Sequence, residues 1–136
     1  MVKQFLFGVI LLTIVSCSDA NEGFLGEWEG VSERLNDSGN LIEVEVSCMI
    51  KSASGLKRNV ELKVGGKEYT FDAYDDMGEL VYNEKPLNSD STIIFYISGM
   101  GMIVNDTILR MDHDLYALKN GALLNVENEV LEMTRK

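Results

Sequence analysis

The chain is poor in the residues on which reactive sites and nucleic-acid interfaces depend. Its 136 residues include one histidine, one tryptophan, one proline and two cysteines, and 12 basic residues stand against 22 acidic ones, a formal charge of −10. A lone histidine excludes multi-histidine metal sites, and two cysteines exclude a disulfide-rich scaffold. The acidic excess, with no cluster of basic residues, argues against a nucleic-acid partner. With 46% hydrophobic and 25% charged residues, the composition is that of one globular domain.

The first 16 residues have the pattern of an export signal. Lys3 supplies a positive charge, and the apolar run from Phe5 to Val15 is shorter than the roughly 20 residues that a membrane-spanning helix needs. The segment from Ile14 to Cys17 resembles the lipobox of bacterial lipoproteins. That resemblance implies cleavage before Cys17, acylation of its thiol and a helical signal peptide. An ordinary signal peptide and a spanning anchor are the alternatives.

These patterns divide the chain into a signal peptide (1–16), a lipidated tether (17–23) and a folded domain (24–136). Without Lys3 the mature chain has 11 basic and 22 acidic residues, a formal charge of −11. Lipidation of Cys17 leaves Cys48 as the one thiol, so no internal disulfide can form. The resemblance to lipoproteins implies a lipid anchor in the cell envelope of a Gram-negative bacterium. Ser18 after the lipidated cysteine favours the outer membrane, and surface exposure stays open.

From residue 24 onward, apolar residues alternate with polar ones, which is typical of half-buried β-strands. The clearest case is Leu41–Ile50. Further segments of this kind are Glu27–Leu35, Val60–Val64, Tyr69–Ala73, Glu79–Asn83, Thr92–Ser98, Gly101–Val104, Thr107–Met111, Leu115–Lys119, Leu123–Val126 and Val130–Thr134. Gly65 and Gly66 suit a tight hairpin, and Pro86 is predicted to lie in a connection between strands. About 8–10 short strands predict an all-β fold, an antiparallel up-and-down barrel, with a β-sandwich as the alternative.

The start of the folded domain resembles a known family of barrels. Gly26 and Trp28 match the Gly-x-Trp pattern that opens the first strand of lipocalin-like (calycin-type) proteins. The resemblance implies that Trp28 closes the barrel floor and that Arg135 or Arg110 stacks across it. The chain lacks the disulfide of larger lipocalins and the helix pair of fatty-acid-binding proteins, so the resemblance does not name a ligand class.

The alternation also predicts which side chains face the barrel interior. They are Trp28, Val44, Val46, Cys48, Val60, Leu62, Tyr69 and Phe71. Methionine and aromatic residues of the second half could either fill the core or line a pocket: Met100, Met102, Met111, Met133, Phe95 and Tyr96. A small barrel has room for packed side chains or for one small ligand, and both alternatives stay open.

Reactive chemistry has little support. His113 is the sole histidine, and no Gly-x-Ser-x-Gly motif presents a nucleophile. We expect Asp112–Asp114 to form a solvated turn, and the acids Asp72, Asp75 and Asp76 to lie near a hairpin turn without the register of a calcium loop. The sequence therefore predicts no catalytic residue, no metal site and no cofactor.

We expect a non-enzymatic, lipid-anchored binding protein of the cell envelope, with a small apolar ligand inside the barrel. The alternative is an interaction or inhibitor protein that binds a basic protein partner through its acidic outer face, including Glu43, Glu45 and Glu61. Asp90-Ser91-Thr92 and Asp106-Thr107-Ile108 also fit a short O-glycosylation pattern of exported proteins. The oligomeric state is not predicted.

Overall fold

The computed structural model describes residues 23–89 and 92–136. The signal peptide, Cys17, the tether up to Glu22, and Asp90 and Ser91 lie outside these ranges, so the predictions made for them concern residues that are not described. Within the described ranges, no helix is long and apolar enough to cross a membrane.

Eight antiparallel strands form one closed barrel in which each strand pairs with the next along the chain and the last pairs with the first. The strands are β1 (Gly26–Leu35), β2 (Leu41–Ser52), β3 (Lys57–Val64), β4 (Lys67–Asp76), β5 (Glu79–Ser89), β6 (Ile93–Val104), β7 (Ile108–Lys119) and β8 (Ala122–Arg135). The predicted all-β up-and-down barrel is confirmed, and the β-sandwich is wrong.

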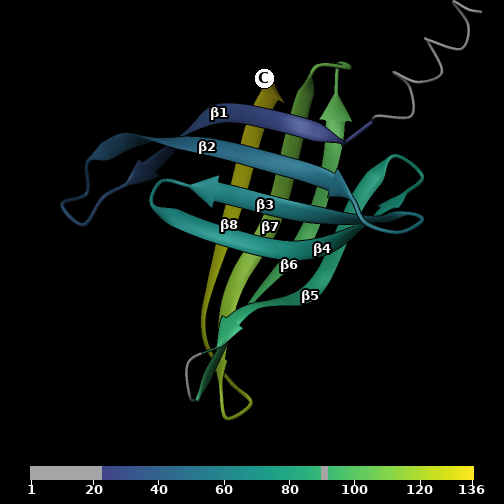
Figure 1. The fold of residues 1–136 in the computed structure, drawn as a ribbon. Helices are drawn as coiled ribbons and strands as arrows, with labels where there is room; N and C mark the ends of the chain where they lie inside the picture. Colours follow the sequence, from purple (N-terminus) through teal and green to yellow (C-terminus); the bar gives the residue numbers. More distant parts are fainter. Residues whose placement is uncertain (1–22, 90–91) are drawn as a thin grey trace, which may run out of the picture.

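The barrel consists of two groups of strands that differ in direction. Strands β1–β4 run across the view of Figure 1, whereas β5–β8 run along its height and continue below them. The groups are joined by short ladders: three residue pairs link β4 to β5, and two link β1 to β8. Because closure uses only these short ladders, the lower part of β5–β8 forms an open end of the barrel.

The last three strands are longer than predicted. Each of β6, β7 and β8 joins two segments that the sequence pattern separates, at Gly99, at Asp112–Asp114 and at Glu127–Glu129 respectively. The residues between the predicted segments continue the alternation of inward and outward side chains instead of ending the strand. The turn predicted at Asp112–Asp114 is therefore wrong. Pro86 also lies within β5, next to a shift in strand register, and not in a connection.

Trp28 closes one end of the barrel, and Arg135 covers it. The Trp28 side chain is 1% exposed, and its indole N–H donates to the carbonyl of Phe24 at 2.9 Å. The guanidinium of Arg135 lies 4.2 Å from the indole ring and donates to the carbonyls of Leu25 and Gly23. Of the two arginines predicted to stack here, Arg135 is the one that does so.

Candidate ligand cavity and buried polar network

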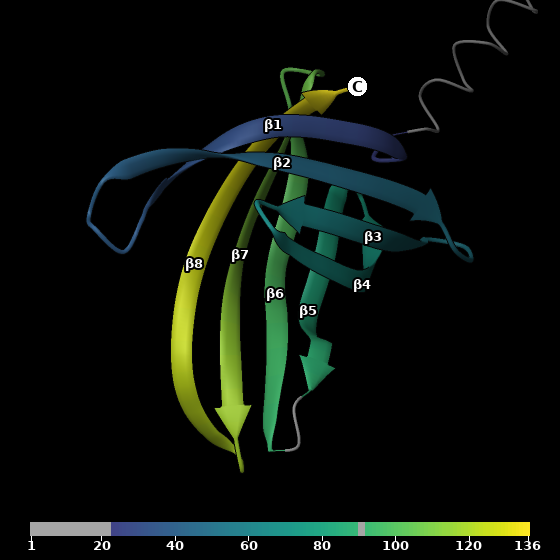
Figure 2. The same cartoon turned by 60° about the vertical axis from the view of Figure 1, so that its left-hand side comes forward.

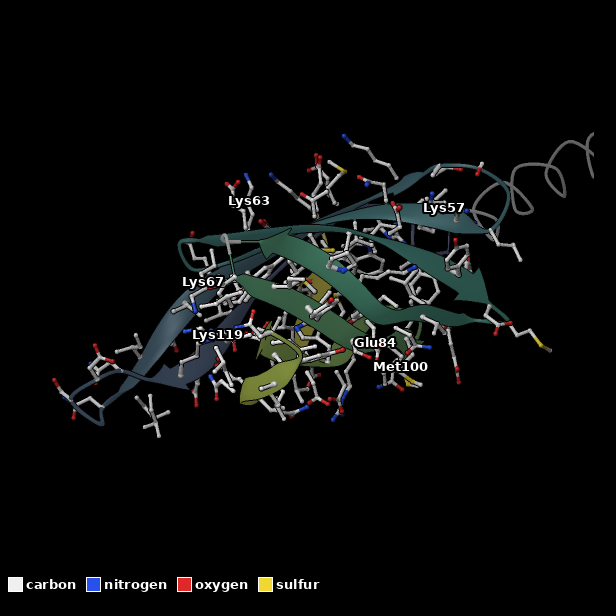
Figure 3. The ribbon with its side chains drawn as sticks, turned by 90° about the horizontal axis from the view of Figure 1, so that it is seen from below. Lys57, Lys63, Lys67, Glu84, Met100 and Lys119 are labelled. Carbon is white, nitrogen blue, oxygen red and sulfur yellow. The ribbon has the colours of Figure 1, made fainter. Side chains whose placement is uncertain are left out.

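A cavity of about 580 Å³ lies at the open end of the barrel, far from Trp28. Trp28 pairs with Arg135 at the end of β8, whereas the cavity is lined by residues from the beginning of β8. Its apolar and aromatic lining residues are Tyr69, Leu87, Ile93, Phe95, Tyr96, Leu115, Tyr116, Ala117 and Leu124, and its polar ones are Lys67, Glu68, Asn125 and Glu127. Figure 3 shows the barrel from below relative to Figure 1, and Lys67, one of the lining residues, is labelled on the left of that view.

Strand register explains how the apolar wall forms. Phe95 pairs with Ala117, and Ile97 pairs with Leu115, so these neighbours on β6 and β7 share the inner face. Ile97 is fully buried, whereas Phe95 is 40% exposed. The same face is thus packed core near the centre of the barrel and open wall near its lower end.

A chain of four polar side chains lies inside the barrel. The Tyr82 hydroxyl is 2.9 Å from Nδ1 of His113, and Nε2 of His113 is 2.9 Å from Oε1 of Glu129. Oε2 of Glu129 forms an ion pair with the guanidinium of Arg34. Tyr82, His113 and Glu129 are buried, and Arg34 is half-buried. Tyr82, His113 and Glu129 thus each have a polar partner inside the barrel, as a low-dielectric interior requires.

The hydrogen-bond partners determine the protonation of this network. A carboxylate only accepts, so neutral His113 carries its proton on Nε2 and donates it to Glu129, while Nδ1 accepts from the Tyr82 hydroxyl. The pKa of His113 is lowered to about 4, mainly because the ring is buried; the charges of Asp112 and Asp114 oppose this change, and the charge of Arg34 adds to it. Because Arg34 already neutralises Glu129, an imidazolium would add an uncompensated buried charge. Burial also raises the pKa of the Tyr82 hydroxyl.

A glycine makes room for the histidine. Gly99 pairs with His113 across β6 and β7, and a Cβ at Gly99 would lie 2.4 Å from Cβ of His113 and 2.3 Å from the carbonyl oxygen of Asp112. No side chain fits at that distance. The glycine, which interrupted the predicted strand, is what allows the two strands to approach here.

The network was missed in the sequence, although one signal for it was available. His113 and Glu129 occupy the inward positions of their strands, in step with Met111 and with Leu131. Arg34 likewise continues the inward positions of β1 that begin at Trp28. A polar residue in the register of buried apolar residues points to a buried network, and this signal identifies His113 and Glu129.

The structure places the residues predicted for the interior in two environments. Trp28, Val46, Cys48, Val60, Leu62 and Phe71 are buried in the core, and Val44 and Tyr69 are partly buried against it. Tyr69 also lines the cavity. Burial raises the pKa of Cys48 to about 12, so the thiol stays protonated and acts as a small apolar side chain.

Of the other side chains singled out in the sequence, Phe95 and Tyr96 line the cavity, and the rest lie apart from it or inside the core. Met111 and Met133 are buried, whereas Met100 and Met102 are exposed and do not line the cavity. Asp72 pairs with Lys57, and Asp75 with Arg58, so these acids do not converge. Among the described residues, no three His, Cys, Asp or Glu side chains are placed to hold a metal ion. Glu43, Glu45 and Glu61 are exposed, and Glu61 pairs with Lys51.

Fold and cavity define the class of protein: a small, closed, eight-stranded up-and-down β-barrel with an open, largely apolar cavity, compatible with a lipocalin-like barrel. No protein-family model matches the chain, and the comparisons with curated proteins and with solved structures give no match either.

Proposed function

We propose that the chain is a non-enzymatic binding protein that holds a small apolar ligand, or the apolar part of a larger one, in the open end of a lipocalin-like barrel. The observation that carries this proposal is the cavity of about 580 Å³, which lies within the usual size range of small-molecule sites. Its walls are mainly aliphatic and aromatic, and its charged side chains, Lys67, Glu68 and Glu127, stand among them. Such a lining favours apolar groups.

The buried network has the features of a structural element and not of a catalytic one. His113 is 1% exposed, and both of its ring nitrogens are engaged by Tyr82 and Glu129. Neither His113 nor Tyr82 lines the cavity. A general acid or base must reach the substrate directly or through one water molecule, so this arrangement supports a binding role for the barrel.

Filling the cavity is expected to abolish ligand binding. In the variant Ala117→Phe, the added ring enters the space lined by Phe95 and Asn125, the residues that pair with Ala117 on either side. We expect the dissociation constant of the neutral fluorescent probe N-phenylnaphthylamine to rise by about tenfold or more, the equivalent of about 1.4 kcal/mol. Fluorescence titration of the full-length chain measures it.

The matched control is Ala53→Phe, because Ala53 is exposed in the turn between β2 and β3, away from the cavity. It carries the same substitution and should bind the probe like the parent chain. If the parent chain does not bind the probe, or if Ala117→Phe binds it equally well, the cavity is not a ligand site.

We further propose that Cys17 carries a lipid that anchors the barrel in the cell envelope, on the outer membrane of a Gram-negative bacterium. Support comes from the pattern of Lys3, the apolar run and the segment Ile14 to Cys17. In the variant Cys17→Ala, the protein should move from the membrane to the soluble periplasmic fraction and lose labelling by radioactive palmitate. Cys48→Ala, which removes the buried thiol, should leave both unchanged. Membrane retention of Cys17→Ala would contradict lipidation.

A further inference from the structure

Within the described part of the chain, the beginning of β8 has a free backbone edge on its β1 side. β8 pairs with β7 along its length, but among the described residues it pairs with β1 only at Thr134 and Arg135. Figure 2 shows the lower half of β8 at the left margin, with β7 on one side and no strand on the other. A free edge is a row of unpaired donors and acceptors that can pair with another strand.

The direction of these donors follows from one hydrogen bond. The N–H of Lys136 donates to the carbonyl of Glu27 on the β1 side, at 2.9 Å. Alternate residues of a strand direct their N–H groups to the same side, and the register with β7 is unbroken from Thr134 back to Asn125. The N–H groups of Val126, Asn128 and Val130 therefore point to the free edge.

The sheet of strands β5–β8 has two outer edges, one on β5 and one on β8. The β5 edge is protected against the addition of another strand, whereas the β8 edge is not. Among the residues that the structure describes, the lower part of β5 also lacks a partner on its β4 side, but it contains Pro86, Lys85 and two shifts in register. Proline, lysine and bulges are the common devices that prevent strand addition. The segment Ala122–Val126 of β8 has no proline and no charge, and Leu123, Leu124 and Val126 are 53–59% exposed. Of these two edges, only that of β8 suits pairing.

The free edge also borders the cavity. Leu124, Asn125 and Glu127 line the cavity and belong to the same stretch of β8. Side chains of a strand alternate between the two faces of the sheet. A strand added beside β8 would therefore direct every second side chain toward the cavity and the others toward the outer face, near Leu123 and Val126.

We infer that β8 binds an extended, cationic segment of another polypeptide by strand addition, and that the alternate apolar side chains of this segment enter the cavity. This inference rests on the proposed function, because it names the ligand class of the same cavity. A polypeptide offers donors and acceptors at the spacing of a strand edge. The formal charge of −10 favours a cationic segment, and of the charged side chains that line the cavity, Glu68 and Glu127 are acidic and Lys67 is basic. The stretch Ala122–Asn128 is about 23 Å long at roughly 3.3 Å per residue, which matches about seven residues.

The test compares two variants that differ at one backbone N–H. Val126→Pro removes a donor from the free edge and leaves the ladder to β7 in place, whereas Val126→Thr retains the donor. The probe is a capped, fluorescein-labelled heptapeptide that alternates valine with lysine and threonine, and its binding to the full-length chain is followed by fluorescence anisotropy. We expect Val126→Pro to weaken binding at least tenfold and Val126→Thr to change it less than twofold. The unlabelled peptide should also displace N-phenylnaphthylamine from the parent chain.

Two further measurements separate the outcomes. A heptapeptide with alternate backbone nitrogens methylated cannot complete the ladder, so it should not bind the parent chain, and this arm holds even if Val126→Pro fails to fold. If the parent chain binds N-phenylnaphthylamine, but its binding of the heptapeptide is absent or is insensitive to Val126→Pro and to methylation, strand addition alone is overturned. If the parent chain does not bind N-phenylnaphthylamine, the proposed function is overturned. A parent chain that sediments as a dimer, and becomes monomeric with Val126→Pro, would assign the edge to a second copy and overturn the inference.

Discussion

Replacing Trp28 by alanine is expected to lower the free energy of unfolding by about 3–5 kcal/mol. The indole is buried at the closed end of the barrel, where its N–H bonds to Phe24 and its ring lies under Arg135. The substitution leaves a large void and removes the cation–π contact between the Arg135 guanidinium and the indole ring. Urea unfolding followed by far-ultraviolet circular dichroism measures the loss.

Two variants at position 135 measure how much Arg135 itself contributes to the free energy of unfolding. Arg135→Ala removes both the stacking and the bonds to Leu25 and Gly23, and should cost about 1–2 kcal/mol. Arg135→Lys retains the charge but not the planar group that donates to two carbonyls, so it should restore only part of the loss. If Arg135→Ala and Trp28→Ala each cost less than about 0.5 kcal/mol, the closed end does not stabilise the barrel as described.

Lowering the pH from about 6.5 to about 4 is expected to reduce the stability contributed by His113 by about 3 kcal/mol. An unfolded histidine has a pKa of about 6.5, whereas burial lowers the pKa of His113 to about 4 in the folded chain. Between these values the unfolded state binds the proton and the folded state does not, so protonation favours unfolding. Each unit of pKa difference is worth about 1.4 kcal/mol. The contribution is complete above pH 6.5 and lost by pH 4.

The control is His113→Gln, which does not titrate in this range. Carboxylates also change charge below about pH 5, so the informative quantity is the difference between the two stability curves from pH 7 to pH 5. The parent chain should lose stability more steeply than His113→Gln, even though the variant starts lower. Parallel curves would mean that the imidazole gains a proton in the folded barrel as readily as in the unfolded chain.

Much of the barrel was predictable because strand alternation is a local property. The alternation in Leu41–Ile50 and in Val60–Val64 predicted two strands of the first group, and Gly65 and Gly66 marked the tight turn between β3 and β4, where Gly65 has a φ of +61°. The strand limits of the second group were not predictable in the same way. Gly99 and Asp112–Asp114 are residues that favour turns locally, and only pairing across β6 and β7 keeps them extended.

The cavity and the network were less accessible from sequence. The sequence indicated Tyr69 for the interior and Phe95 and Tyr96 as possible pocket residues, and all three line the cavity. It did not indicate Leu87, Leu115 or Leu124. Whether an inward residue fills the core or lines an open wall depends on how far β5–β8 continue past β1–β4, as Figure 1 shows. No pattern within one strand contains that information.

By itself the sequence determined the strand class of the chain and the order of its strands, and its resemblance to lipocalin-like barrels indicated Trp28 at the closed end with Arg135 or Arg110 to cover it. The strand class and the strand order follow from a period of two and from short connections, which act between neighbours along the chain. Only the tertiary structure decided that Arg34, Tyr82, His113 and Glu129 meet, and that, among the described residues, β8 pairs with β1 only at Thr134 and Arg135. These outcomes depend on register and on the closure of the barrel between strands far apart in the sequence. A buried polar side chain is stable only where that closure supplies its partner.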